Sequence, residues 1–307
     1  MTPDLSVSLG PLRLQNPVLV AAGTFGYGVE FQEFFDLKSL GGVITKTLTL
    51  APRAGNPAPR VVETPSGMLN AVGLQNIGID DFVKAKWPEL EALHVPVIIS
   101  LAGFTRDEFV ELAQKAQLDG VAGIELNLSC PNVSHGEGAR CFAQSVQDTS
   151  EVVRAVKAVS RVPVVAKLTP EVADIRAIAR AAAEAGADAL SLINTMAGMV
   201  IDLEREKPVL ANKTGGLSGP ALHPVAVRCV WEAADAVQVP LIGVGGVSGG
   251  REALEMILAG ASAVAVGTAT FWNPRAPKIV LDELTRLVRR KGRPVRELIG
   301  AARRLAA

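Results

Sequence analysis

Residues 162–194, VPVVAKLTPEVADIRAIARAAAEAGADALSLIN, contain a helix-like segment between two short apolar runs. The runs 162–168 and 187–194 are rich in valine, leucine and alanine, as is typical of parallel strands that are buried on both faces. Between them, Thr169-Pro170-Glu171 offers an N-cap, a proline at the first helical position and an acid in the first turn, and Gly186 closes the segment. The stretch is therefore predicted to form a strand–helix–strand unit.

The same alternation continues along the chain. Ser248 is expected to cap another helix, which Gly260 ends. Six further apolar runs occupy residues 16–23, 41–47, 95–100, 123–129, 239–245 and 261–268. Eight strands that alternate with helices predict an α/β fold, a closed (β/α)8 barrel of the TIM type. Since no linker or low-complexity tract interrupts residues 1–307, a single domain is expected.

Several segments fall outside this alternation. LSVSLGPLRLQNP (5–17) is predicted to form an N-terminal hairpin with its turn near Gly10-Pro11, lying beneath the barrel. The connections 48–79, 130–148 and 196–221 are long and leave the C-terminal ends of strands. Loops of this length are usually functional, and barrel active sites lie at this end, so they are expected to cover the mouth.

Composition excludes several classes of function. The 307 residues include 31 basic and 31 acidic side chains, which leaves no charge pattern for nucleic acid or anionic lipid. The three cysteines, Cys130, Cys141 and Cys229, form no C-x-x-C pair, so neither a metal site nor an iron–sulfur cluster is expected in this chain. The N-terminus lacks a signal-peptide pattern and no run reaches the ~18 apolar residues of a membrane span. A soluble, cytoplasmic protein is therefore expected.

Polar side chains occur at the predicted C-terminal ends of five strands. They are Lys46, Ser100, Asn127, Lys167, Asn194 and Thr195. A single buried lysine could equally form an internal ion pair, but two lysines and two asparagines at matching heights favour a polar, partly anionic ligand.

The last two strands end in glycine instead, at Gly245-Gly246 and Gly267-Thr268. Barrels often bind phosphate between these loops, where backbone N–H groups face the anion. A phosphate at one side and an electron-rich group near two lysines together fit flavin mononucleotide (FMN).

Cys130 follows the strand 123–129 directly, in ELNLSCPN (125–132). Its thiol is suited to act as a general base on a carbon acid. The alternative is a small buried apolar residue, which fits Cys229 better, while Cys141 could be either. Asn127 and Asn132, which could hydrogen-bond a planar polar substrate, favour the base at Cys130.

Seven motifs resemble those of the dihydroorotate dehydrogenases, the flavin enzymes of pyrimidine synthesis. They are NPVLVAAGTFGYG (16–28), GNPAPRVVETPSGMLNAVGLQNIG (55–78), ELNLSCPNVSHG (125–136), INTMAG (193–198), ANKTGGLSGPA (211–221), GVGGV (243–247) and AVAVGTA (263–269). The cysteine of SCPN looks like class 1, and GNPAPR and GMLNAVGLQN are similar to class 1B rather than to the fumarate-using class 1A.

The resemblance implies oxidation of dihydroorotate to orotate in UMP biosynthesis, with FMN bound by the single barrel domain. Cys130 would take the C5 proton while a hydride passes from C6 to the flavin. Electrons would pass to NAD+ through a partner subunit that carries FAD and a [2Fe–2S] cluster, in a homodimer or heterotetramer. A class 1A-like enzyme, another FMN-barrel pyrimidine reductase or a non-redox phosphate-binding barrel are the alternatives.

The resemblance also implies roles for individual residues. The substrate-binding set is Lys46, Asn70, Ala71, Val72, Gly73, Leu74, Asn127, Asn132, Asn194 and Thr195. The FMN-binding set is Ala22, Gly23, Lys46, Thr47, Ser100, Asn127, Lys167, Ile193, Gly219, Gly245, Gly246, Gly267 and Thr268. Lys167 would stabilise negative charge on the reduced ring. Two departures from the family are Ser100, where asparagine is common, and the loop 138–148.

Overall fold

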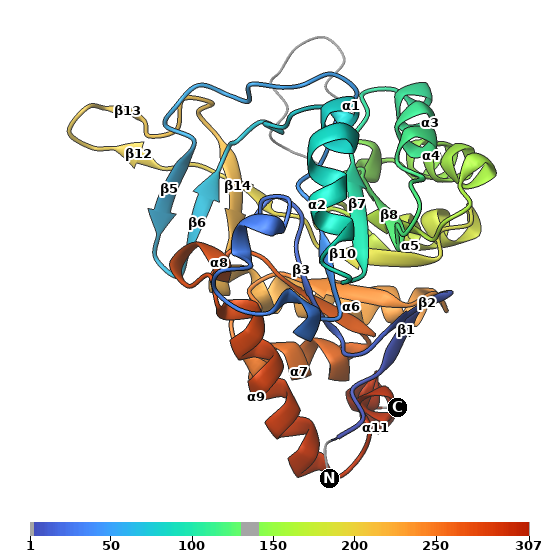
Figure 1. Ribbon diagram of the computed structural model, residues 1–307. Helices are drawn as coiled ribbons and strands as arrows, with labels where there is room; N and C mark the ends of the chain where they lie inside the picture. The colour runs from blue at the N-terminus through green and yellow to red at the C-terminus, as the bar shows by residue number, and fades with distance from the viewer. Residues whose placement is uncertain (1–2, 130–140, 307) are drawn as a thin grey trace.

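A computed structural model of the chain describes residues 3–129 and 141–306. Eight parallel strands close into a barrel (Figure 1), in which the last barrel strand in the sequence pairs with the first barrel strand. In spatial order they are β10 (Ala189–Leu192), β15 (Leu241–Val244), β16 (Ala263–Val266), β3 (Val18–Val20), β4 (Gly42–Ile44), β7 (Val97–Leu101), β8 (Gly123–Asn127) and β9 (Val164–Lys167). The predicted (β/α)8 barrel is confirmed; seven strands lie inside their predicted runs, and β7 extends one residue beyond its run of 95–100.

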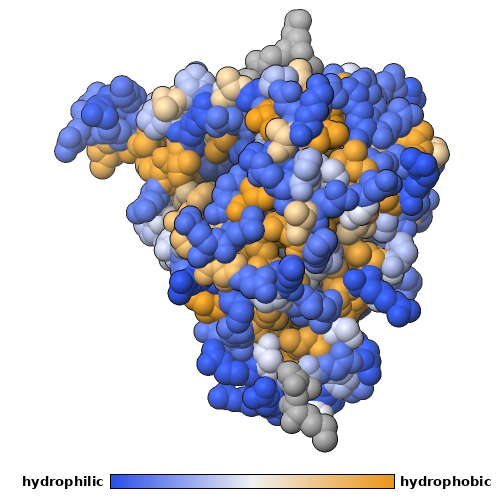
Figure 2. Space-filling view, viewed as in Figure 1, coloured by the Kyte–Doolittle hydropathy of each residue, from blue (hydrophilic) through white to orange (hydrophobic). Residues whose placement is uncertain are grey.

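Helices surround the barrel, and the helices from α3 to α7 each contact the next (Figure 1). Those that follow barrel strands are α1 (Ile79–Asp81) with α2 (Trp87–Glu91), α3 (Arg106–Lys115), α4 (Val146–Val159), α5 (Ile175–Glu184), α6 (His223–Ala236), α7 (Gly250–Ala259), α8 (Ala269–Trp272) and α9 (Ala276–Lys291). A π turn (Phe82–Lys86) joins α1 to α2, and α10 (Val295–Leu298) and α11 (Ala301–Ala306) follow α9. Hydrophilic residues cover most of the face shown in Figure 2, and no helix among the described residues is long and apolar enough to cross a bilayer.

Two predicted helix starts are wrong. Helix α5 begins at Ile175 because Asp174 caps it, accepting a hydrogen bond from the Arg176 N–H at 3.0 Å. Thr169 instead closes a turn by accepting from the Glu171 N–H at 3.2 Å. The start of α7 also departs from prediction.

Helix α7 begins at Gly250, and Ser248 does not cap it. The Gly250 N–H donates to Glu283 Oε2 on α9, at 2.8 Å, so a side chain from a neighbouring helix takes the role of the cap. The helix ends at Gly260, as predicted.

The predicted N-terminal hairpin is present, as strands β1 (Val7–Leu9) and β2 (Leu12–Leu14). Its turn lies against the base of the barrel, because a Cβ placed on Gly10 would be 3.1 Å from the backbone oxygen of Asp188, the residue before β10. Asp188 also binds Lys157 Nζ at 2.5 Å and the Val164 N–H at 2.8 Å, which ties the N-terminal ends of two strands together.

Two of the long connections are strands rather than loops. An antiparallel sheet contains, in order, β11 (Met196–Gly198), β14 (Gly215–Ser218), β6 (Gly67–Asn70) and β5 (Val61–Thr64). We call these four strands the roof sheet. The short pair β12 (Ile201–Asp202) and β13 (Lys207–Pro208) projects beside it (Figure 1). Of the third connection, residues 130–140 lie outside the described residues, and a 3-10 turn (Phe142–Gln144) leads into α4.

Candidate active site

A pocket lies at the C-terminal ends of the barrel strands, between these ends and the roof sheet. The space between its walls is about 1,220 Å³, part of which opens to solvent. Of the predicted site residues it is lined by Ala22, Gly23, Lys46, Thr47, Asn70, Val72, Gly73, Leu74, Asn127, Lys167, Ile193, Asn194, Thr195, Gly219, Gly245, Gly246, Gly267 and Thr268. Residues from nearly 250 positions of sequence therefore meet in one cavity.

Four predicted residues are not among the lining residues. Cys130 and Asn132 lie outside the described part of the chain. Ala71 is fully buried, and both its backbone groups are used: its N–H donates to the Arg60 oxygen at 2.7 Å and its oxygen accepts from Asn56 Nδ2 at 2.9 Å. Its expected direct contact with substrate is therefore corrected.

Ser100 is also fully buried and does not reach the pocket. Its Oγ lies 3.0 Å from Thr47 Oγ1, and Thr47 stands between it and the cavity. The expected direct contact of Ser100 with a cofactor is therefore corrected, because Ser100 is connected to the pocket through Thr47.

Sequence reasoning missed several lining residues, among them Gln75, Ser248, Phe271 and Trp272. The side chains of Phe271 and Trp272 stand at the pocket edge with 57% and 55% of their surface exposed. The available signal was a pair of adjacent aromatic residues one position after the glycine-containing motif AVAVGTA, in a chain with 4% aromatic residues.

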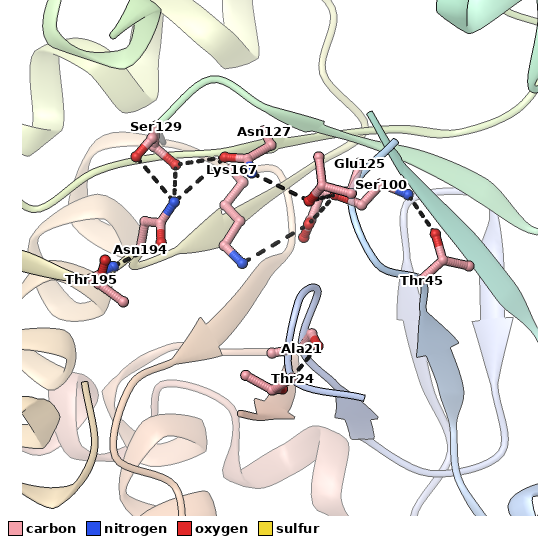
Figure 3. Close-up of polar contacts among 11 residues, drawn as sticks. Ala21, Thr24, Thr45, Ser100, Glu125, Asn127, Ser129, Lys167, Asn194 and Thr195 are labelled. Carbon is pink, nitrogen blue, oxygen red and sulfur yellow. Dashed lines mark hydrogen bonds and ion pairs between the residues drawn. The ribbon is translucent and has the colours of Figure 1, made fainter. Parts of the chain in front are cut away.

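Asparagine side chains organise the polar wall of the pocket (Figure 3). Asn194 Nδ2 donates to the Ser129 oxygen at 3.0 Å and to Ser129 Oγ at 2.9 Å, while Asn194 Oδ1 accepts from the Thr195 N–H at 2.8 Å. Asn127 Nδ2 donates to Thr47 Oγ1 at 3.3 Å. These bonds hold the amides in fixed orientations, a requirement for selective recognition of a polar ring.

Thr195 Oγ1 is buried and has no hydrogen-bond partner among the described residues. A buried hydroxyl without a partner is costly, and a bound ligand with a polar group would satisfy it. Thr195 lines the pocket, so this atom marks a position where a ligand is expected to donate or accept a hydrogen bond.

Burial affects the charge of Lys46, which lines the pocket. Burial removes its ammonium from water and lowers its pKa below the ordinary 10.5; the positive charge of Arg60 adds to this effect, and Glu30 opposes it. An anionic ligand group would compensate the unfavourable burial of this charge.

At the glycine end of the pocket, the loop around Gly246 packs tightly against His223. Gly246 has φ +66°, and a Cβ there would lie 2.6 Å from His223 Cβ, so no larger residue fits without displacement. His223 Nδ1 lies 2.9 Å from the Gly245 oxygen, and Nε2 lies 3.2 Å from Glu255 Oε2. His223 therefore supports this loop through its ring nitrogens.

A buried acid, Glu125, lies beneath the polar wall and was not singled out from the sequence. Its Oε1 is 4.0 Å from Lys167 Nζ and 3.3 Å from Ser100 Oγ (Figure 3). The signal was a glutamate in an otherwise apolar strand, two residues before Asn127 and therefore on the same face.

Comparisons with known proteins agree with this geometry. The family profile described as dihydroorotate dehydrogenase matches residues 4–288. A protein of Citrifermentans bemidjiense, described as the catalytic subunit of dihydroorotate dehydrogenase B (NAD(+)), is 54% identical over 97% of this chain and 98% of its own length. A Desulforudis audaxviator protein of the same description is also 54% identical, over 97% of both chains.

A solved structure shows the same fold. The dihydroorotate dehydrogenase of Eimeria tenella, in complex with ferulenol, superposes with a TM-score of 0.82 at 26% identity, covering 98% of this chain and 89% of the other. The barrel, the polar pocket and the full-length sequence similarity lead to the same result: the chain belongs to the dihydroorotate dehydrogenase family.

Proposed function

We propose that this chain, as a single FMN-binding domain over residues 1–307, oxidises dihydroorotate to orotate in pyrimidine biosynthesis. The observation that carries the proposal is the pocket itself, in which two lysines, three asparagines and a glycine-lined end meet in a chain of this family. A carboxylated ring with amide groups matches the cations and amides, and a flavin phosphate matches the glycines.

The residues present fit FMN. The phosphate would be held by backbone N–H groups at the glycine end, where the loop takes the positive φ of Gly246; the residues proposed are Gly219, Gly245, Gly246, Gly267 and Thr268. The ring would rest on Ala22, Gly23, Thr47 and Ile193, with Lys46, Asn127 and Lys167 at its polar edge. When bound, FMN supplies the acceptor for the hydride that leaves C6 of the substrate.

Substrate recognition is assigned to the polar wall and to the segment after β6. Lys46 would pair with the carboxylate, since an anion offsets the burial of its ammonium. The proposed partners of the ring amides are Asn70, Asn127, Asn132, Asn194 and Thr195, with backbone groups of Val72, Gly73 and Leu74. The buried Thr195 hydroxyl supports this assignment because it has no partner among the described residues.

Cys130 is proposed as the base that removes the C5 proton. It is joined by a peptide bond to Ser129, which Asn194 holds through two hydrogen bonds at the pocket wall. A thiol is the better base near neutral pH because its pKa of about 8.5 is far below that of a hydroxyl.

The electron acceptor and assembly form a further part of the proposal. The relatives' description, "Dihydroorotate dehydrogenase B (NAD(+)), catalytic subunit", supports a partner subunit and NAD+ as the final acceptor. The partner would carry FAD and a [2Fe–2S] cluster, in an assembly built on a homodimer, such as a heterotetramer. The cytoplasm is the proposed location.

Anaerobic reduction of the purified chain tests the proposal. The protein should be yellow, and dihydroorotate should bleach the flavin bands, whereas dihydrouracil, which lacks the carboxylate, should not. Cys130→Ser should slow the bleaching by at least about 100-fold near neutral pH, within the range of a lost general base.

The assignment would be overturned if the purified chain contained no flavin. It would also be overturned if dihydrouracil bleached the flavin bands and dihydroorotate did not. Turnover with fumarate by the isolated chain would indicate a class 1A-like acceptor. Reduction of NAD+ only after addition of a co-purified subunit would support class 1B.

A further inference from the structure

Glu125 lies inside the barrel directly beneath the pocket. It is at the centre of β8, and its register partner on β7 is Ser100, while Asn127 pairs with Lys167 on β9. Residues two apart on a strand share a face, so Glu125 and Asn127 both point to the barrel interior. The carboxylate is completely shielded from solvent, and its ion-pair partner is Lys167, with Nζ 4.0 Å from Oε1.

The arrangement is poorly suited to a purely stabilising role. Removing a carboxylate from water costs several kcal/mol, about as much as a good ion pair returns, and apolar residues of similar size are often more stable. Here the pair is formed through one oxygen at the limit of ion-pair distance, and among the described residues Oε2 has no hydrogen-bond partner. Stability alone gives little reason for this charge.

A series of short polar contacts fixes the carboxylate from the other side. Ser100 Oγ lies 3.3 Å from Glu125 Oε1 and 3.0 Å from Thr47 Oγ1. The Ser100 N–H donates to Thr45 Oγ1 at 3.1 Å, which holds Ser100 in place. Oε1 is therefore held between Ser100 and Lys167 (Figure 3), while Lys167 Nζ faces both Glu125 and the pocket.

We propose that Glu125 is a positioning residue that acts through Lys167: it holds the Lys167 ammonium at the pocket floor and reduces the positive charge presented to a bound flavin. The proposal rests on the proposed function, because the flavin is assigned to this pocket. Lys46 and Lys167 alone would place two positive charges beside the ring, and the carboxylate leaves a net charge of about one. Without it, an anionic form of the flavin would be stabilised more strongly.

The first test uses the FMN-loaded chain and Glu125→Gln, which preserves shape and removes the charge. Sulfite, an anion whose complex with oxidised flavin is stabilised by positive charge, should bind about tenfold more tightly. This is the effect of one unit charge across about 10 Å at an effective dielectric constant near 20. The two-electron midpoint potential should rise by about 30 mV, the equivalent of tenfold.

Two variants serve as controls. Glu125→Asp keeps the charge, so its sulfite affinity should stay within about threefold of the original and its potential within about 14 mV, the equivalent of threefold. Ser100→Ala removes a carboxylate contact without changing any charge and should behave like Glu125→Asp. A merely structural Glu125 would instead lower the stability of all three variants and leave the potential unchanged.

The second test needs no flavin. In the FMN-free chain, acetylation of Lys167 by acetic anhydride, followed by peptide mass spectrometry, should be severalfold faster in Glu125→Gln, because the amine is no longer held. Lys46 in the same pocket is the internal reference. If Glu125→Gln does not fold, Glu125→Asp should show an intermediate rate.

The outcomes separate the two proposals. Unchanged acetylation of Lys167 in the variants would overturn the positioning role whether or not flavin binds. Faster acetylation with unchanged sulfite affinity would overturn the electrostatic role. If the chain binds no FMN, the proposed function is overturned. The acetylation rates would then still show whether Glu125 holds the Lys167 ammonium in place.

Discussion

Gly216→Ala should damage the pocket from within the roof sheet. Gly216 pairs with Asn70 on β6 and Ala197 on β11, and a Cβ added to it would lie 2.0 Å from Thr195 Oγ1 and 2.6 Å from Thr195 Cβ. Carbon–oxygen contacts this short are strongly repulsive, so Thr195 must withdraw by about 1.4 Å to restore ordinary contact. Overpacking of this kind costs about 1–3 kcal/mol of folding free energy.

The same movement removes the Thr195 hydroxyl from its place on the pocket wall. Loss of one hydrogen bond to a ligand lowers affinity by about 0.5–1.5 kcal/mol, roughly two- to tenfold. Orotate titration followed by flavin absorbance measures the second effect, and urea unfolding measures the first.

Gly198→Ala is the matched control in the same sheet. Its added Cβ would meet only the tip of a flexible side chain, Leu69 Cδ2 at 3.0 Å, so orotate affinity should stay near that of the original chain. Gly216→Ala with unchanged orotate affinity and unchanged unfolding would refute the reasoning from Thr195.

Three further predictions concern titration, reactivity and capping. Because burial lowers the pKa of Lys46, the unfolded chain binds more protons between that lowered value and 10.5, so the ligand-free stability should rise with pH through this range. Lys46→Met should flatten the rise in a pH series of urea unfolding, and an identical slope would contradict it. Cys229 is fully buried and burial raises its thiol pKa, so of Cys141 and Cys229 a thiol reagent should label the half-buried Cys141 first and Cys229 only on unfolding, as mass spectrometry would show. Thr105 caps α3 by accepting from the Glu108 N–H at 3.1 Å, so Thr105→Ala should cost about 1 kcal/mol in urea unfolding, whereas the exposed neighbour Arg106→Ala should cost far less.

The barrel strands could be predicted because burial on both faces leaves a local signal. Most of the eight runs are apolar on both faces, although β8 carries Glu125 and Asn127, and the residues of β10 and β16 are all buried, as such runs require. The polar strand ends were equally visible, since Lys46, Asn127 and Asn194 interrupt these runs at the same height.

Contacts between distant segments could not be predicted in this way. The capping of α7 depends on Glu283, 33 positions after Gly250, and no local pattern connects the two. The roof sheet depends on Asn70 meeting Gly216, 146 positions away, in segments whose glycine and proline content is typical of loops. Ser100 was placed at the correct height, but its burial behind Thr47 depends on how three strands pack.

Closure of the barrel has a consequence for synthesis of the chain on the ribosome. Val18 of β3 can pair with Val264 of β16 only after nearly the whole polypeptide has been synthesised. Likewise, Asn70 of β6 can pair with Gly216 of β14 only after the segment that contains Gly216 has been synthesised. Until then β3 has an open, apolar edge, which is the kind of surface that chaperones protect. A nascent chain arrested between these two points would therefore expose an apolar strand edge and would lack the residues that complete the pocket.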